Sequence, residues 1–157
     1  MGLVIGRKEL AQKIAEHRAR NQKIVSTNGC FDILHIGHVR ILNAAKALGD
    51  VLVVGVNSDS SVAHLKGPKR PVVPEAERAE ILANLQAVDY VTIFPEDTPI
   101  ELLKIIKPDV HVKGRDYNRN SLGEAPLVES LGGRIELIDL VPGSSTTDLI
   151  ARVRETN

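Results

Sequence analysis

The chain has little cysteine, few aromatic residues and no net charge. Its single cysteine excludes a disulfide bond within the chain and is typical of proteins in a reducing cytoplasm. Aromatic residues make up 3% of the sequence and tryptophan is absent, which argues against a surface on which nucleic-acid bases stack. The 20 basic residues are balanced by 20 acidic residues, so the charge favours no nucleic-acid partner.

Long hydrophobic segments are absent as well. No apolar run is long enough to span a bilayer, and residues 1–20 carry charges throughout, unlike the apolar centre of a signal peptide. We therefore expect a cytoplasmic protein with no membrane partner. Hydrophobic residues still supply 43% of the 157 residues, which is enough for the core of a single domain.

Apolar segments of strand type alternate with segments of helical periodicity. The expected strands cover residues 23–26, 51–56, 88–94, 110–112 and 134–140, and the expected helices cover 8–18, 37–48, 74 onwards, 99–106, 124–131 and 146–154. The run 51–56 is apolar throughout, as in strands that are buried on both faces of a parallel sheet. The alternation predicts an α/β fold, a Rossmann-like, doubly wound parallel sheet of about five strands in one domain.

Further expectations concern borders and loops. Residues 1–22 are expected to form a helix that packs on the core, and residues 23–157 the domain that carries the function. The polar segment 58–73, rich in glycine, proline and lysine, is expected to be a loop. In the helix that follows, Ile81 and Leu82 are expected to point inward.

Polar motifs follow the expected strands near residues 28, 56, 112 and 140. Because the carboxyl ends of parallel strands meet at one edge of a sheet, these motifs are expected to converge on one site. The first motif contains His35-Ile36-Gly37-His38, at the point where a strand hands over to a helix. Two histidines three positions apart share one helical face, and N–H groups at the start of a helix attract phosphates. The tetrad therefore predicts a phosphate site with two imidazoles.

The tetrad and its context resemble the signature of the HxGH nucleotidylyltransferase superfamily. The resemblance extends from Val25 to Val153 and is closest to the adenylyltransferase domain of bacterial ADP-heptose synthases. It is carried by NGCFDILHIGHVRILNAAKALGDVLVVGVNSD from Asn28 to Asp59, and then by KGPKRP, VDYV, VKGRDY and SSTT. Because 157 residues leave no room for the sugar-kinase domain of the bifunctional enzymes, that activity is expected on a separate protein.

This resemblance implies transfer of AMP from ATP to D-glycero-D-manno-heptose 1-phosphate. The products are ADP-heptose, a precursor of lipopolysaccharide or another surface polysaccharide, and pyrophosphate. A phosphate monoester has a second pKa of about 6, so this nucleophile is largely ionised at neutral pH and needs no general base. Direct in-line displacement then depends on positioning and on stabilising charge. The resemblance also implies Mg²⁺ with ATP, small-molecule substrates, and a homodimer or higher homo-oligomer.

The resemblance assigns roles to residues at each strand end. The catalytic residues are expected to be His35, His38 and Lys66. The expected nucleotide-binding residues are Gly29, Phe31, Gly37, Gly114, Asp116, Ser145 and Thr146. The residues expected to bind the sugar phosphate are Asp32, Asn57, Asp59, Lys69, Arg78 and Lys113. The sequence contains no visible cluster of metal ligands, so Mg²⁺ is implied by the nucleotide chemistry alone.

Several of these residues have structural explanations as well. Asp32 is also a turn-forming residue, and Ser144–Thr147 is also an ordinary helix N-cap cluster. Lys69 would equally suit a solvated loop. Arg78 stands near the start of a helix, where a cation opposes the helix dipole and needs a carboxylate or a phosphate as its partner.

Other functions remain alternatives. An FMN adenylyltransferase (FAD synthase) shares the run before the tetrad but generally lacks the STT signature. A glycerol-3-phosphate cytidylyltransferase carries an arginine just before that signature, where this chain has Leu140-Val141-Pro142-Gly143. A non-catalytic nucleotide-binding module is the alternative of a different class. One cleft that holds both histidines and the hydroxyls of Ser144–Thr147 would favour an enzyme, and scattered positions would exclude one.

Overall fold

A parallel sheet of six strands forms the centre of this computed structural model, which describes residues 1–156. The strands are β1 (Leu3–Val4), β2 (Ile24–Gly29), β3 (Val51–Asn57), β4 (Tyr90–Phe94), β5 (Val110–Gly114) and β6 (Arg134–Ile138). Their order across the sheet is β1-β4-β3-β2-β5-β6. The predicted α/β class and parallel sheet are confirmed.

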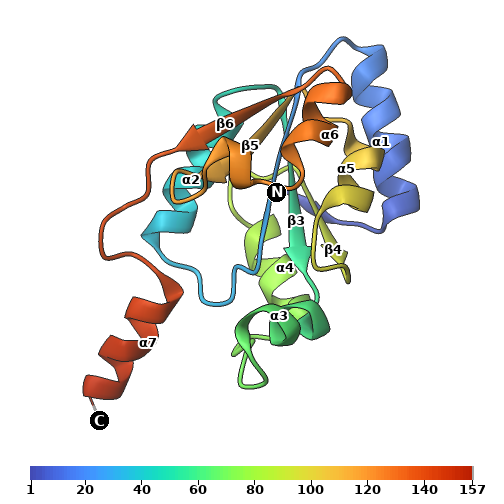
Figure 1. The fold of residues 1–157 in the computed structure, drawn as a ribbon. Coiled ribbons are helices and arrows are strands. Elements are labelled where there is room, and N and C mark those ends of the chain that lie inside the picture. The colour runs from blue at the N-terminus through green and yellow to red at the C-terminus, as the bar shows by residue number, and fades with distance from the viewer. Residues whose placement is uncertain (157) are drawn as a thin grey trace.

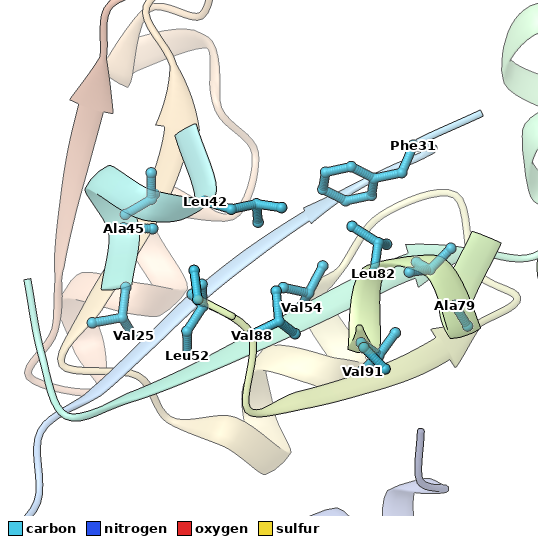
Figure 2. Packing of buried hydrophobic residues seen from close by; sticks show 14 of the residues in the cluster. Val25, Phe31, Leu42, Ala45, Leu52, Val54, Ala79, Leu82, Val88 and Val91 are labelled. Atoms are coloured by element: carbon cyan, nitrogen blue, oxygen red, sulfur yellow. The ribbon is translucent and has the colours of Figure 1, made fainter. Parts of the chain in front are cut away.

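Helices connect the strands and cover both faces of the sheet (Figure 1). They are α1 (Arg7–Ala19), α2 (Ile36–Lys46), α3 (Asp59–Lys66), α4 (Glu75–Ala83), α5 (Ile100–Ile106), α6 (Ala125–Ser130) and α7 (Thr146–Glu155), with a short 3-10 helix η1 (Arg119–Ser121). One face is covered by α2 and α4 and the other by α1 and α5. Figure 2 shows the first of these faces, where the side chains packed on the strands include Leu42 and Ala45 from α2 and Ala79 and Leu82 from α4.

The apolar residues of β3 contribute side chains to the hydrophobic clusters on both faces of the sheet. Leu52 and Val54 belong to the cluster under α2 and α4, whereas Val51 and Val53 belong to the cluster under α1 and α5. Successive side chains of a strand point to opposite faces, so a strand that is covered on both faces must be apolar at every position. The continuous hydrophobicity of this segment is therefore explained by its central place in the sheet.

β1 is a strand that was not predicted from the sequence. It pairs in parallel with the start of β4, and its two residues are too few to show an alternating pattern. The chain reaches this edge through Gly2, whose N–H donates a hydrogen bond to the Ala83 carbonyl at 2.7 Å. A Cβ at Gly2 would lie 2.5 Å from the carbonyl oxygen of Val88, so only glycine permits this approach.

α3 lies within the segment that was expected to be a loop, so that prediction is wrong for residues 59–66. The helix begins at a local signal, because the hydroxyl of Ser58 accepts a hydrogen bond from the Ser61 N–H at 3.2 Å. It is held in place by Val62, which has 0% exposure. One buried apolar residue in a helix of 8 residues gives little periodicity to recognise in a sequence.

The order of the strands reverses beside β2. The chain runs from β2 outward through β3 and β4, and then crosses back to build β5 and β6 on the other side of β2. Loops that leave the carboxyl ends of β2 and β5 therefore diverge and leave a crevice between them. Ligands of open α/β sheets bind at such a position.

α7 extends away from the sheet in Figure 1, and none of its described residues is buried. Its first residue nevertheless lies beside the loop after β2, where the Thr146 hydroxyl donates a hydrogen bond to the Ile33 carbonyl at 3.4 Å. Among residues 1–156, no helix combines the length and the apolar character that crossing a membrane requires.

Neighbouring residues of α4 differ sharply in burial. Leu82 has 0% exposure and belongs to the core cluster, whereas Ile81 is 46% exposed, so the expected inward direction of Ile81 is wrong. We expect Leu82→Ala to lower the free energy of unfolding by about 2–5 kcal/mol, because it leaves a cavity in the core. Denaturation by urea measures this loss.

Ile81→Ala is the matched control in the same helix. Its exposed side chain is expected to contribute about 1 kcal/mol or less. Equal losses from the two variants would contradict the packing of α4 described above.

Candidate active site

A cleft of about 590 Å³ opens at the carboxyl edge of the sheet. Its walls come from the ends of β2, β3 and β5, from the start of α2 and from the segment before α7. The predicted site residues that line it are Gly29, Phe31, Asp32, His35, Gly37, His38, Asn57, Lys66, Lys113, Gly114, Asp116, Ser145 and Thr146. The motifs at the strand ends therefore surround one cleft, as an enzyme requires.

His35 and His38 lie against each other at the start of α2, with ring centroids 3.8 Å apart and planes tilted by 26°. The Nδ1 of His35 accepts a hydrogen bond from the Gly37 N–H at 3.1 Å. The Nδ1 of His38 is 3.4 Å from the backbone N–H of His35 and accepts from it. A ring nitrogen that accepts carries no hydrogen, so in the neutral state each ring is protonated at Nε2. Two Nε2–H donors are thereby available to an anion.

Both imidazoles are held in the neutral state. Burial lowers the pKa of His38 to about 4, and the neighbouring His35 acts in the same direction. Burial also lowers the pKa of His35. Near neutral pH the pair therefore supplies hydrogen bonds without charge, and the positive charge of the cleft comes from other side chains.

Gly37 leaves no room for a side chain. A Cβ at this position would lie 2.9 Å from ring atoms of His35 and 3.1 Å from the carbonyl oxygen of Ser144. Glycine therefore lets the tetrad approach the segment before α7 closely. Phe31 supports the tetrad from the core, with its ring centroid 5.2 Å from that of His38 and a φ of 48° that side-chain-bearing residues rarely adopt.

The segment before α7 lies against the tetrad and forms another part of the wall. Ser145 is the N-cap of α7, and its hydroxyl accepts a hydrogen bond from the Asp148 N–H at 3.0 Å. Ser145 and Thr146 both line the cleft. The first N–H groups of a helix have no partner within the helix, so the start of α7 can donate to an anion in the cleft while Ser145 also acts as a cap.

Asp32 anchors the loop between α3 and α4. Its carboxylate accepts hydrogen bonds from the N–H groups of Val72 and Val73, at 2.8 and 2.9 Å, and from the guanidinium of Arg70. Burial alone would raise the pKa of Asp32, but these hydrogen bonds outweigh it and lower the pKa. The side chain has 0% exposure, so in this arrangement it presents no free oxygen to a sugar hydroxyl or a metal ion.

Arg78, Asp59 and Lys69 are predicted site residues that lie outside the set lining the cleft within residues 1–156. Arg78 is 1% exposed. Its guanidinium donates to the Asp59 carboxylate at 2.8 Å and to three backbone carbonyl groups, those of Cys30, Asn57 and Val73. The partner that this cation requires is thus Asp59, and Arg78 ties the ends of β2 and β3 to α4. The geometry does not support a direct contact of Arg78 with substrate.

Lys66 and Lys113 bring positive charge to the cleft. Lys66 is exposed at the C-terminal end of α3. Lys113 is 8% exposed, and its Nζ lies 3.3 Å from both the backbone and the side-chain oxygen of Asn28. Burial lowers the pKa of Lys113, although Glu124 and Asp116 act against that shift.

The cleft also contains residues that were not predicted from the sequence. They include Asn28, Cys30, Asp97, Thr98, Glu124 and Leu140. Asn28 and Cys30 stand inside the motif that contains the tetrad, so their position was a usable signal. Asp97 and Thr98 follow β4, whose end carries no recognisable motif. Glu124 stands well beyond the end of β5, and only the path of the intervening segment returns it to the cleft.

Carboxylates line the cleft singly and do not form a metal cluster. Among residues 1–156, no group of three or more His, Cys, Asp or Glu side chains is arranged to hold a metal ion. Asp116 is exposed and Asp97 lies at the far end of the cleft, beyond β3. This set suits Mg²⁺ that is held mainly by nucleotide phosphates and water, with few protein ligands.

Comparison with protein families finds one matching model. It is described as cytidylyltransferase-like and matches residues 26–152. Curated relatives include the bifunctional protein HldE of Syntrophotalea carbinolica, 53% identical over 94% of this chain and 30% of that protein. HldE of Geobacter metallireducens is 56% identical over 92% of this chain and 29% of that protein. The chain thus spans about 30% of the length of the curated relatives it matches.

Solved structures share the same architecture. The lipopolysaccharide core biosynthesis protein from Thermoplasma volcanium GSS1 superposes with a TM-score of 0.63 and 30% identity, covering 76% of this chain and 97% of that chain. Pantoate-beta-alanine ligase from Francisella tularensis superposes with a TM-score of 0.69 and 17% identity, covering 98% of this chain and 77% of that chain. The second likeness shows the fold alone.

The neutral state of His38 makes the stability of the fold depend on pH. Its pKa is about 4 in the folded chain against 6.5 for an unperturbed histidine. Between these values the unfolded chain binds more protons, so stability is lost as the pH falls below about 6.5. We expect wild type to lose about 2 kcal/mol more than His38→Gln between about pH 7 and about pH 5.

Urea denaturation at the two pH values measures this difference. Other histidines with lowered pKa, such as His111, contribute equally to both proteins and cancel in the comparison. The same pH dependence in wild type and His38→Gln would show that His38 is not held neutral by the fold.

Proposed function

Because the chain belongs to the cytidylyltransferase-like family, we propose that it transfers AMP from ATP to heptose 1-phosphate and releases pyrophosphate. The observation that most supports this function is that one cleft, at the carboxyl edge of the sheet, holds both histidines, Lys66 and the hydroxyls before α7. Support for the acceptor comes from the resemblance to the adenylyltransferase domain of ADP-heptose synthases and from identities above 50% with HldE proteins.

The reaction is a direct displacement at the α-phosphorus of ATP. An anionic oxygen of the sugar phosphate forms a bond to this phosphorus, while the bond to the oxygen that bridges the α- and β-phosphates breaks. Pyrophosphate leaves with the electron pair. The monoester is largely ionised at neutral pH, so neither a general base nor a covalent enzyme intermediate is required.

Hydrogen-bond donors of the cleft suit the charge that develops. The Nε2–H groups of His35 and His38 would donate to phosphate oxygens, and neutral donors fixed in place act without any proton transfer. The N–H groups at the start of α7, with the hydroxyls of Ser145 and Thr146, would hold the β- and γ-phosphates. Lys66 would balance the remaining negative charge.

The two substrates would occupy opposite ends of the cleft. Gly114 and Asp116 at the end of β5, with Gly29 and Phe31 after β2, would surround the nucleoside. Asn57 at the end of β3 would then face the sugar phosphate. Mg²⁺ would enter with ATP and neutralise phosphate oxygens. We also propose a cytoplasmic location and a homo-oligomeric state for this enzyme.

Release of pyrophosphate in the presence of Mg²⁺ tests this function. ATP, CTP and GTP are each combined with the two anomers of heptose 1-phosphate, with FMN and with glycerol 3-phosphate. We expect release with ATP and one heptose anomer. His35→Ala is expected to lower turnover by a factor on the order of 10² or more, because a donor to the transition state is lost.

The other outcomes are distinct. Release with FMN or glycerol 3-phosphate, but not with a heptose phosphate, would keep the mechanism and overturn the acceptor. No release with any pair would overturn the enzymatic role in favour of a nucleotide-binding module.

Lys66, the last residue of α3, and Lys69, in the loop after it, offer a matched test, because both are exposed but only Lys66 lines the cleft. We expect Lys66→Ala to lower kcat about tenfold or more through loss of a charge near the phosphates. Lys69→Ala should stay within about twofold of wild type. Steady-state kinetics at saturating ATP measures both, and the reverse ranking would show that the other lysine serves the reaction.

A further inference from the structure

Glu124 is a buried carboxylate in the wall of the cleft that the mechanism above does not use. It lies directly before α6, and its side chain is 9% exposed. Within residues 1–156 no other residue donates a hydrogen bond to its carboxylate, and the His111 Nε2 is 3.6 Å from Oε1, longer than a hydrogen bond. A carboxylate in such surroundings is stable only when donors occupy its lone pairs.

A row of buried groups leads from β2 through β5 towards this carboxylate. The hydroxyl of Ser26 in β2 lies 2.7 Å from the Nδ1 of His111 in β5. Burial lowers the pKa of His111, so its ring is neutral, accepts from Ser26 at Nδ1 and directs its Nε2–H towards Glu124. Ser26 is 1% exposed and out of reach of a substrate, so the row orients Glu124 and is not a nucleophilic triad.

The charge of Glu124 is also balanced locally. Burial alone would raise its pKa, but His111 and the cation of Lys113 outweigh burial and lower the pKa. Lys113 itself is fixed, with its Nζ 4.9 Å from the centre of the Tyr117 ring and 3.3 Å from the oxygens of Asn28. Glu124 is therefore an ionised, positioned acceptor that faces the cleft.

We propose that Glu124 accepts a hydrogen bond from an O–H or N–H group of the nucleoside and thereby contributes to nucleotide selection. This role depends on the proposed function, because it requires ATP in the cleft. By the proposed function the phosphates would bind at the start of α2, which follows β2, and Glu124 lies beyond the adjacent strand β5. Gly114 and Asp116, which are proposed to surround the nucleoside, lie at and just after the end of β5 in the wall of the same cleft. Asn57 and Lys66 lie on the opposite side, which leaves this side to the nucleoside.

Equilibrium binding of nucleotides without acceptor tests this role. Calorimetry compares ATP with 2′-deoxy-ATP, 3′-deoxy-ATP and purine riboside triphosphate, which lacks the exocyclic amine. Wild type is expected to bind one of these analogues about tenfold or more weakly than ATP, because that analogue leaves a buried charged acceptor unpaired. Glu124→Gln should weaken the binding of ATP by a similar factor but should not weaken the binding of that analogue further.

This lack of additivity separates a direct contact from a structural role, which would weaken all ligands alike. Glu129→Gln, on the exposed side of α6, is the matched control and should bind every nucleotide like wild type. Additive losses for all three analogues would overturn the role of Glu124. So would equal binding of all three analogues and ATP to wild type, a result that needs no folded variant.

Binding without an acceptor also keeps this result apart from the proposed reaction. One outcome is that pyrophosphate release fails with every acceptor while the effects of Glu124→Gln and of one analogue on binding remain non-additive. In that case Glu124 keeps its role and the reaction is overturned. If release occurs and no analogue couples to Glu124, the reaction stands and the role of Glu124 is overturned.

Discussion

The reversal of strand order beside β2 is the constraint on which the site depends. All strands run parallel, so the ends of β2, β3 and β5 lie at one edge, and the diverging connections leave a crevice there. The two apolar clusters on opposite faces of the sheet fix these ends relative to one another. α2 begins in this crevice and places two imidazoles where its own first N–H groups also point.

Positive charge is divided between structure and ligand. Arg78 donates hydrogen bonds to backbone carbonyl groups and to Asp59, and Arg70 donates to Asp32. Both arginines thereby stabilise the connection between β3 and α4. Lys66 and Lys113 remain in the cleft. A chain with no net charge can therefore offer a polyanion a cationic site, because the local arrangement and not the sum of charges sets the field that a ligand meets.

Besides these cations, the cleft offers a ligand uncharged hydrogen-bond donors, the imidazoles of His35 and His38. Two stacked imidazoles cannot both be protonated at low cost, and burial keeps them neutral with their Nε2–H groups free. Gly37 lets them lie close to the start of α7, so donors from two distant segments meet across a narrow space. On the other side of β2, the row from Ser26 through His111 to Glu124 adds one fixed acceptor. The cleft thus joins many donors with Glu124, a buried carboxylate at one end.

The sequence by itself determined the α/β class, the parallel sheet and the tetrad at the start of α2, because periodicity and turn chemistry are properties of neighbouring residues. It also determined the family, since the motifs follow one another along the whole domain. Only the tertiary structure decided the strand β1, the exposure of Ile81 and the structural tasks of Asp32 and Arg78. Glu124 belongs with these, because its role follows from His111 on a neighbouring element. Each depends on which residues far apart in the chain pack together and which are left exposed, and local patterns carry no record of that packing.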